Sequence, residues 1–310
     1  MTDNPTPLQV QRLQRELMDT GVISRLEVTE TTTSTNHELL TDATQPGFVN
    51  RWPHFSVLTA EEQTAGRGRL GRGWSSPRGA SLSTSVVLRS SLPQAQRPWF
   101  TLVAGYALVT ILREEHGLAA GLKWPNDVLI DGRKIAGLLA VLPAEDSGAV
   151  ILGCGINVLQ GADELPTEHS TSLRAELAAS GQQTPKAHST EAAALRTDLL
   201  VAWLSRFRHL HETAEATGGI AALRADIVTA ISTLGTRVRV ELPDQTAARG
   251  TAVGVDDDGG LIVEVTERRR TRLDPEAGGG PQDLWEPVPA AVQHFTAADV
   301  IHLRSSRAHS

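Results

Sequence analysis

The segment with the strongest chemical character is Gln63–Trp74, QTAGRGRLGRGW. Four glycines and three arginines fall between Gly66 and Gly73. Glycine allows backbone amides to approach an oxyanion closely, and arginine adds charge-assisted contacts to phosphate or carboxylate. The segment therefore predicts a cradle for a small anionic ligand. The simplest alternative is a solvated basic loop.

Three better-known patterns resemble this segment, and its context argues against each. Gly66, Gly68 and Gly71 match the dinucleotide fingerprint, but the segment 73–77 that follows would not start a helix, and no acidic residue occurs between Glu62 and Glu114. No Gly-Lys-Ser/Thr follows, which excludes a Walker A loop. RNA-binding Arg-Gly segments are repetitive and disordered, whereas this one is short and lies in an acidic chain.

Further polar motifs lie outside this segment. They are STN at 34–36, KWPNDVLIDGRKIAG at 123–137 and GCGINV at 153–158. With GRGRLGRGW they follow the order GRGRxGRxW, KWPND, RKxAG, GxGxN. In this order and spacing, from about residue 30 to the C-terminus, the sequence resembles the biotin protein ligases.

The resemblance implies a two-step reaction. Such enzymes make biotinyl-5′-AMP from biotin and ATP, release pyrophosphate, and transfer biotin to a specific lysine of a carboxylase carrier domain. ATP and Mg²⁺ are then the expected cofactors and biotin the substrate. The expected partner is the biotin carboxyl carrier domain of an acyl-CoA, acetyl-CoA or pyruvate carboxylase.

The resemblance also assigns candidate site residues. The biotin-binding candidates are Ser34, Thr35, Asn36, Gln63, Arg67, Gly68, Arg69, Lys134 and Gly137. The candidates for ATP and adenylate are Arg67, Arg69, Arg72, Trp74, Asn126, Lys134 and Asn157. The catalytic candidates are Lys134, Arg69 and Asp127.

The implied chemistry explains why such residue types are needed. A carboxylate must attack the α-phosphorus of ATP although both groups are negative, so Arg67, Arg69 and Lys134 would neutralise the repulsion. Mg²⁺ on the polyphosphate shares this task. The glycine-rich loop would order over the reactive intermediate and exclude water. We hypothesise that Asp127 orients the acceptor lysine or takes its proton.

Periodicity predicts the elements that position these residues. Strands are expected at 24–30, 54–60, 81–89 and 149–158, and helices at 8–18 and 97–117, the latter capped by Gly117. Asp131-Gly132 between two apolar runs predicts a hairpin. Residues 160–187 are expected to be a loop. A long helix should follow, and its apolar stripe consists of Leu195, Leu199, Trp203, Phe207 and Leu210.

The residue pattern changes after Leu234-Gly235. Segments that alternate polar and apolar residues, separated by a turn of Asp and Gly residues, predict a small antiparallel β module. We expect a catalytic domain over 1–233 and a second domain over 234–310. Residues 275–297 are predicted to form a loose insertion before a last strand at 299–305. The resemblance implies an α+β fold like the class II aminoacyl-tRNA synthetases, a mixed sheet with helices packed on it, followed by an SH3-like β-barrel.

Composition excludes several classes of protein. The chain has 310 residues, 40% of them hydrophobic, and a net charge of −7, which argues against nucleic acid or anionic membranes as general partners. A lone cysteine, Cys154, is expected to be a buried structural thiol in a reducing cytoplasm. Residues 1–10 contain no apolar segment of signal-peptide length, so no signal peptide is expected, and no run reaches the ~18 apolar residues of a membrane span. The histidines lack metal-ligand spacing, so no metal site is expected.

Some expectations concern partners and simpler roles. Only about thirty residues precede Ser34, roughly half of what a winged helix needs, so DNA binding is not expected. A monomer or weak homodimer is expected.

Asn36 would be a helix N-cap on the simplest interpretation. Two other functions stay open: a lipoate or octanoate ligase or transferase of the same fold, and a non-catalytic biotin- or nucleotide-binding regulator.

Overall fold

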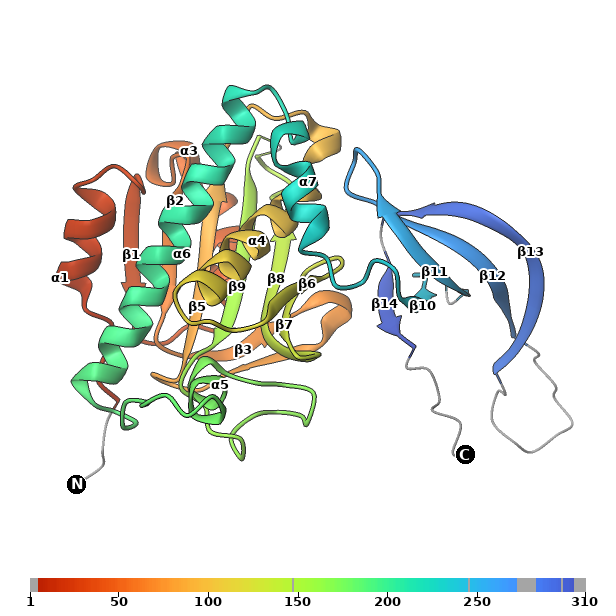
Figure 1. Ribbon diagram of the computed structural model, residues 1–310. Coiled ribbons are helices and arrows are strands. Elements are labelled where there is room, and N and C mark those ends of the chain that lie inside the picture. Colours follow the sequence, from red (N-terminus) through yellow and green to blue (C-terminus); the bar gives the residue numbers. More distant parts are fainter. Residues whose placement is uncertain (1–4, 147, 245, 272–282, 297, 304–310) are drawn as a thin grey trace, which may run out of the picture.

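A computed structural model describes residues 5–146, 148–244, 246–271, 283–296 and 298–303. Its larger unit is built on a seven-stranded sheet of order β1-β2-β5-β9-β8-β7-β6 (Figure 1). Only β1 and β2 pair in parallel, which gives the mixed sheet expected. The strands are β1 Arg25–Thr29, β2 Ser56–Ala60, β5 Ser81–Leu88, β6 Ala120–Lys123, β7 Asp127–Ile130, β8 Arg133–Val141 and β9 Val150–Asn157.

One face of this sheet is covered by two long helices, α4 (Trp99–Glu114) and α6 (Thr190–Ala216). The prediction for α4 is confirmed. Gly117 takes a φ of +66°, and its amide donates to the carbonyl of Arg113, which is the αL type of helix ending. The apolar stripe of α6 is also confirmed, and its Trp203 indole donates to the Ala104 carbonyl at 2.9 Å.

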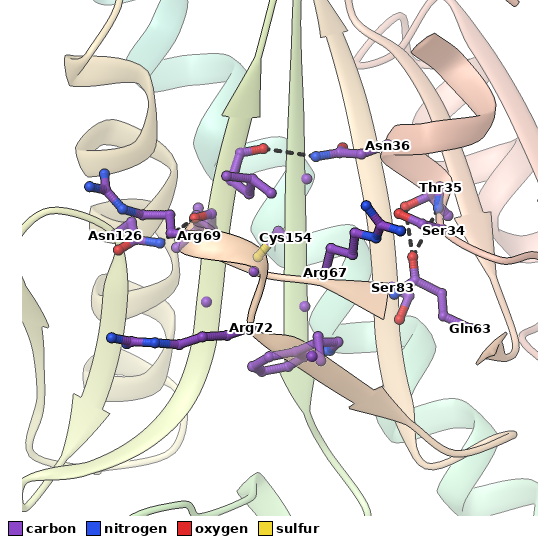
Figure 2. Close-up of a pocket in the computed structure, with 18 of the residues that line it drawn as sticks. Ser34, Thr35, Asn36, Gln63, Arg67, Arg69, Arg72, Ser83, Asn126 and Cys154 are labelled. Atoms are coloured by element: carbon purple, nitrogen blue, oxygen red, sulfur yellow. Dashed lines mark hydrogen bonds between the residues drawn. The ribbon is translucent and has the colours of Figure 1, made fainter. Parts of the chain in front are cut away.

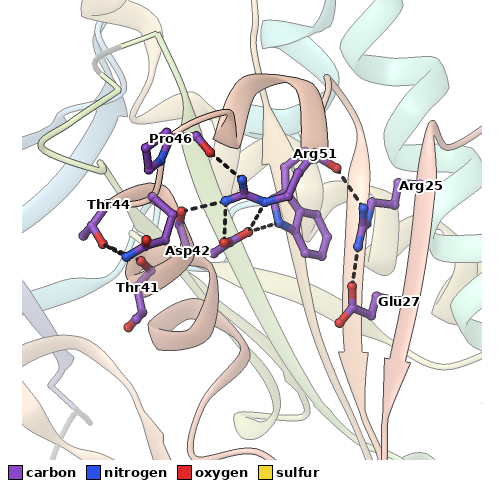
Figure 3. A network of polar contacts seen from close by, with 9 residues as sticks. Arg25, Glu27, Thr41, Asp42, Thr44, Pro46 and Arg51 are labelled. Atoms are coloured by element: carbon purple, nitrogen blue, oxygen red, sulfur yellow. Dashed lines mark hydrogen bonds and ion pairs between the residues drawn. The ribbon is translucent and has the colours of Figure 1, made fainter.

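The opposite face carries α2 (Thr35–Ala43) and α3 (Phe48–Arg51), which bury Leu39 and Phe48 against β2, β5 and β9. A polar network fixes this corner (Figure 3). Asp42 accepts hydrogen bonds from Arg51 and from the Trp52 indole. Burial raises the pKa of Asp42, but these bonds outweigh it and hold the pKa below its usual range. The C-terminal end of α2 is thereby anchored, and its first turn faces the centre of the sheet.

The remaining elements of this unit differ from expectation in places. Residues 8–18 form α1 (Val10–Leu13) and a π-helical turn (Gln14–Met18), which agrees with the predicted short helix. The expected loop at 160–187 contains a short helix, α5 (Leu173–Ala179), so that prediction was wrong there. Ser172 caps it by accepting the amide of Ala175. A further helix, α7 (Ala221–Thr229), follows the Gly-Gly pair and was not predicted.

The C-terminal unit is a five-stranded antiparallel sheet of order β13-β12-β11-β10-β14. Its strands are β10 Arg237–Glu241, β11 Ala247–Val255, β12 Leu261–Thr271, β13 Asp283–Phe295 and β14 Asp299–His302. Among the described residues β13 and β14 are the two edges and do not pair, so the sheet is not closed as a barrel.

The prediction of a loose insertion at 275–297 was wrong for residues 283–295, which form strand β13. Pro287 and Pro289 suggested a loop because proline cannot donate a ladder hydrogen bond. On an edge strand one side of the backbone needs no partner, so both prolines are tolerated. Residues 275–282 and 297 lie outside the described part of the chain.

Two tryptophans join the units. The turn between β11 and β12 accepts a hydrogen bond from each indole. The Trp99 indole donates to the Asp257 carbonyl and the Trp124 indole donates to the Gly259 carbonyl, each at 2.9 Å. Gly259 has a φ of +84°, and a Cβ there would lie 3.3 Å from Trp99. Two independent reasons therefore favour glycine at this position: the positive φ of the backbone and the lack of space beside Trp99.

His54, His211 and Glu215 form a polar cluster within the aromatic core, with ligand-type atoms within 4.8 Å of one another. The His54 Nδ1 accepts the amide of Arg89, so the neutral ring carries its proton on Nε2 and offers no lone pair there to a metal ion. This tautomer disfavours a metal site, and the expectation of no metal site stays a prediction. Burial lowers the pKa of His54, and burial lowers that of His211 to about 4.

No helix among the described residues is both long and apolar enough to cross a membrane.

We predict that Gly259→Ala lowers the free energy of unfolding by about 1–2 kcal/mol, because the new side chain adds strain at positive φ and presses on Trp99. Urea unfolding followed by tryptophan fluorescence measures the loss. Gly254→Ala is the matched control, since that glycine lies in the same sheet without positive φ and its Cβ would meet only ordinary contacts. Equal stability of the two variants would contradict the prediction.

We also predict that His211 makes stability depend on pH. Its pKa is lowered in the folded state, so the unfolded chain binds the proton more tightly. The associated stability is fully present above about pH 6.5 and is lost as pH falls toward 4. Between pH 7 and 5, wild type should lose about 1–2 kcal/mol more than His211→Leu in urea unfolding.

The control for this prediction is His209→Leu, the same change at an exposed position of the same helix. It should keep the pH dependence of wild type. The opposing contribution of Glu215, which raises the pKa of His211, sets a limit on the size of the effect. Parallel pH profiles for wild type and His211→Leu would contradict the assignment.

Candidate active site

A pocket of about 160 Å³ opens over the centre of the large sheet, on the face that carries α2. It gathers nearly all the residues assigned by the sequence motifs (Figure 2). Those lining it are Ser34, Thr35, Asn36, Gln63, Arg67, Gly68, Arg69, Arg72, Trp74, Asn126, Asp127, Lys134 and Gly137. Asn157 lines an adjoining hollow that shares Trp74 and Lys134. The fold therefore brings segments from four separate motifs to one place.

The Arg/Gly segment is a short hairpin. Strands β3 (Gln63–Arg67) and β4 (Gly73–Ser76) pair, and a 3-10 turn (Arg69–Gly71) joins them. The tip needs two residues at positive φ, Leu70 at 54° and Gly71 at 73°. The expected loop is therefore a paired ribbon that lies across the pocket.

The cationic side chains of the hairpin reach different ends of the pocket. Figure 2 shows Arg67 on the side of Ser34 and Thr35, with Arg69 and Arg72 on the side of Asn126. Arg69 donates to the carbonyl of Ala298 in the C-terminal unit at 2.9 Å. Together with Lys134 these arginines give the lining four cationic groups beside the one carboxylate of Asp127. Such a lining favours a ligand with more than one negative group.

The first turn of α2 forms the other end of the pocket. Gln63 Oε1 accepts the amide of Thr35 at 2.9 Å and lies 3.2 Å from its hydroxyl. Asn36 does not cap the helix, because Ser34 occupies the N-cap position. The Asn36 amide instead crosses to β8, where it donates to the Leu139 carbonyl at 3.0 Å. The capping interpretation of Asn36 was therefore wrong.

Lys134 and Asp127 form an ion pair, with Nζ and Oδ1 2.7 Å apart. The two side chains are 33% and 20% exposed, so water still reaches the pair and screens it. The hairpin turn at Asp131-Gly132, where both residues have positive φ, sets the register that places them side by side. Lys134 Nζ also lies 5.5 Å from the centre of the Trp74 ring, within the range of a cation–π contact.

The floor of the pocket is made by glycines on β8 and β9. A Cβ on Gly137 would lie 2.9 Å from Lys134 Nζ, and one on Gly153 would lie 2.6 Å from Asn36 Oδ1. At Gly155 a Cβ would lie 2.5 Å from the Trp74 indole. Three site side chains thus rest directly on the sheet backbone. The GCGINV motif carries two of these glycines, but its role as a floor was not foreseen.

Two asparagines serve the frame of the site. Asn126 donates to the Leu138 carbonyl at 2.6 Å, and Asn157, which is buried, donates to the Thr171 carbonyl at 3.0 Å. The Asn157 oxygen also accepts the side-chain amide of Gln160 at 3.2 Å, so Asn157 is bound into the frame at both ends of its amide group.

Some lining residues were not assigned to the site from the sequence: Ser83, Thr84, Leu138, Leu139 and Cys154. Cys154 is buried, and burial raises the pKa of its thiol, which agrees with a structural thiol and disfavours a nucleophile. The alternation of Ser81, Ser83 and Ser85 on a buried strand was the available signal, since a polar face inside a core needs partners.

Comparison with known proteins agrees with this geometry. Residues 28–157 match the Biotin/lipoate A/B protein ligase family, and residues 233–303 match the biotin protein ligase C terminal domain. The Biotin--[acetyl-CoA-carboxylase] ligase of Mycobacterium tuberculosis is 35% identical over 84% of this chain and 92% of its own. The bifunctional ligase/repressor BirA of Bacillus subtilis is 31% identical over 82% of this chain and 73% of its own.

Among solved structures, biotin protein ligase from Aquifex aeolicus in complex with biotin and ATP is similar, with a TM-score of 0.65. It covers 91% of this chain and all of its own, at 23% identity, and so supports the fold alone. The ordered motifs, the pocket they line and the relatives that span both units have one consistent explanation. This chain belongs to the biotin protein ligase family.

Proposed function

We propose that the chain activates biotin with ATP to biotinyl-5′-AMP and then transfers biotin to a lysine of a carboxylase carrier domain. The observation that carries this proposal is the convergence of residues from STN, GRGRLGRGW, KWPND and RKIAG on one cationic pocket. The relatives of this chain that are named as biotin–[acetyl-CoA-carboxylase] ligases support the same activity.

In the first step an oxygen of the biotin carboxylate attacks the α-phosphorus of ATP, and pyrophosphate leaves. Arg67, Arg69 and Lys134 reduce the repulsion between the two anions and stabilise the charge that develops. Asp127 holds the Lys134 ammonium at a fixed place, because the ion pair joins neighbouring strands of one sheet.

Mg²⁺ belongs to the proposal as the companion of ATP. The oxygen donors of Asp127 and Asn126 in the pocket are of the hard type that this ion prefers. When bound to the polyphosphate, the ion would neutralise part of its charge.

In the second step the neutral amine of the acceptor lysine attacks the acyl carbon, AMP leaves, and the amine loses a proton. Asp127 is the carboxylate in the pocket, and we propose that it orients this amine or takes its proton. Residues 1–233 would form the catalytic domain, and residues 234–310 would form a second domain that supports it. We further propose that the enzyme is cytoplasmic, does not bind DNA, and is a monomer or a weak homodimer.

The two other functions have less support. A lipoate ligase would share the catalytic family, but the match at 233–303 is to a C-terminal domain of biotin ligases. A non-catalytic regulator would have no need of an intact pair of Lys134 and Asp127.

We predict that the purified chain catalyses ATP–pyrophosphate exchange that depends on biotin, and that lipoate and octanoate do not replace it. Incorporation of labelled pyrophosphate into ATP measures the reaction directly, because only reversible formation of an acyl adenylate supports exchange. Exchange with lipoate, and none with biotin, would reject the proposed function.

We predict that Asp127→Asn slows transfer from preformed biotinyl-5′-AMP at least tenfold, because the carboxylate near the acceptor amine is lost. The exchange reaction should fall less, since Lys134 remains. Single-turnover transfer to an isolated carrier domain measures the second step alone. The matched control is Asp131→Asn, which removes one negative charge from the adjacent turn. Transfer at the wild-type rate in Asp127→Asn would sink the assigned role.

A further inference from the structure

A row of three hydroxyls runs along β5 beneath the pocket. Ser81, Ser83 and Ser85 alternate along the strand and therefore share one face of the sheet. On the adjacent strand they lie opposite Asn157, Gly155 and Gly153 respectively. All three serines are buried. A polar face inside a core must be satisfied by specific partners, and here each serine has its own.

The partners belong to different segments of the site. Ser81 Oγ accepts the side-chain amide of Gln160, and Ser83 Oγ lies 2.5 Å from Ser76 Oγ on the hairpin. Ser85 Oγ lies 2.7 Å from both Thr35 Oγ1 and Asn36 Oδ1, in the first turn of α2. Of these contacts, that of Ser85 touches two pocket residues at once, so its effect on a ligand is the most direct.

The protons at this corner can be counted. Ser85 is the donor in both of its contacts, so its single hydroxyl proton is shared between Asn36 Oδ1 and Thr35 Oγ1. The Asn36 amide group is fixed in this orientation because its nitrogen donates to the Leu139 carbonyl. The Thr35 hydroxyl accepts from Ser85 and directs its own proton to Gln63 Oε1. One lone pair of Thr35 Oγ1 is left for the pocket.

Gln63 fixes the orientation of the Thr35 hydroxyl. Its Oε1 accepts both the Thr35 amide and the Thr35 hydroxyl, which occupies its two lone pairs. The group that this corner offers to a ligand is therefore the Thr35 hydroxyl oxygen, which accepts. A ligand with an N–H donor fits here, whereas an aliphatic chain or a disulfide-containing ring leaves this acceptor unpaired, at a cost.

We propose that Ser85 is a positioning residue of the biotin site: it donates to Thr35 Oγ1 while Gln63 accepts the Thr35 proton, and the Thr35 hydroxyl oxygen is thereby presented as an acceptor for a ring N–H of the substrate. This inference rests on the proposed function. The cyclic urea of biotin carries two N–H groups, and lipoate and octanoate carry none. Ser85 thus contributes to substrate selection without touching the substrate.

The experiment compares Ser85→Ala, Thr35→Val and the double variant in biotin-dependent exchange. Ser85→Ala should raise the KM for biotin about tenfold and change kcat less than about twofold, because a binding contact and not the chemistry is weakened. The KM of the double variant for biotin should be no higher than that of the more impaired single variant, since Ser85 acts through Thr35. The control, Ser56→Ala, removes a buried hydroxyl of β2 that donates to the Pro53 carbonyl, and should leave KM unchanged.

The outcomes separate this inference from the proposed function. A wild-type chain without biotin-dependent exchange would overturn the proposed function and this inference with it. An active wild type with unchanged KM in folded Ser85→Ala, or with independent, multiplicative effects of the two substitutions, would overturn the inference alone. Thermal unfolding verifies that each variant is folded. If Ser85→Ala does not fold, Ser85→Cys, which keeps the volume but donates weakly, decides by the same change in KM.

Discussion

The site depends on one steric constraint: three long side chains must lie flat on the surface of a β-sheet. Trp74, Asn36 and Lys134 occupy the space where Gly155, Gly153 and Gly137 would otherwise carry side chains. With ordinary residues at these positions, the hairpin would be lifted and the first turn of α2 pushed outward. The hollow that becomes the pocket exists because β8 and β9 are bare at this point. The glycines therefore determine the shape of the site as much as the charged residues determine its chemistry.

The same face of the sheet changes character along its strands. At the end covered by α2 and α3 it presents Val87 and Ile151 to an apolar cluster. Two residues further along each strand it presents Ser85 and Gly153, and the cluster gives way to the pocket. Since side chains alternate with a period of two, one strand can contribute to a core at one end and to a polar site at the other. The network of Asp42 (Figure 3) holds α2 at the boundary between the two regions.

Much of this arrangement was predictable from sequence, for local reasons. Gly117 ends α4, Asp131-Gly132 forms the hairpin, and the stripe of α6 follows the helical period, because each depends on residues close in the chain. The predictions that were wrong concern residues whose roles depend on partners far away in the sequence. Asn36 was expected to cap a helix, but its partners are Ser85 and Leu139 in other strands. The prolines of β13 are compatible with a strand only because of their place at a sheet edge. The pairing of Lys134 with Asp127 follows from register, which the motifs alone do not give.

The C-terminal unit meets the site through two backbone carbonyls. The carbonyl of Gly259 holds the indole of Trp124, which precedes the pocket residues Asn126 and Asp127 by two and three positions. The carbonyl of Ala298 holds Arg69, which lies on the side of the pocket where Asn126 lies (Figure 2). A carbonyl satisfies a donor without adding charge, so each of these two contacts orients its side chain through a neutral acceptor. Separation of the two units would break both bonds at once and take away the acceptor of the Trp124 indole, which is buried in the assembled chain, so the placement of the second unit is coupled to the geometry of the first.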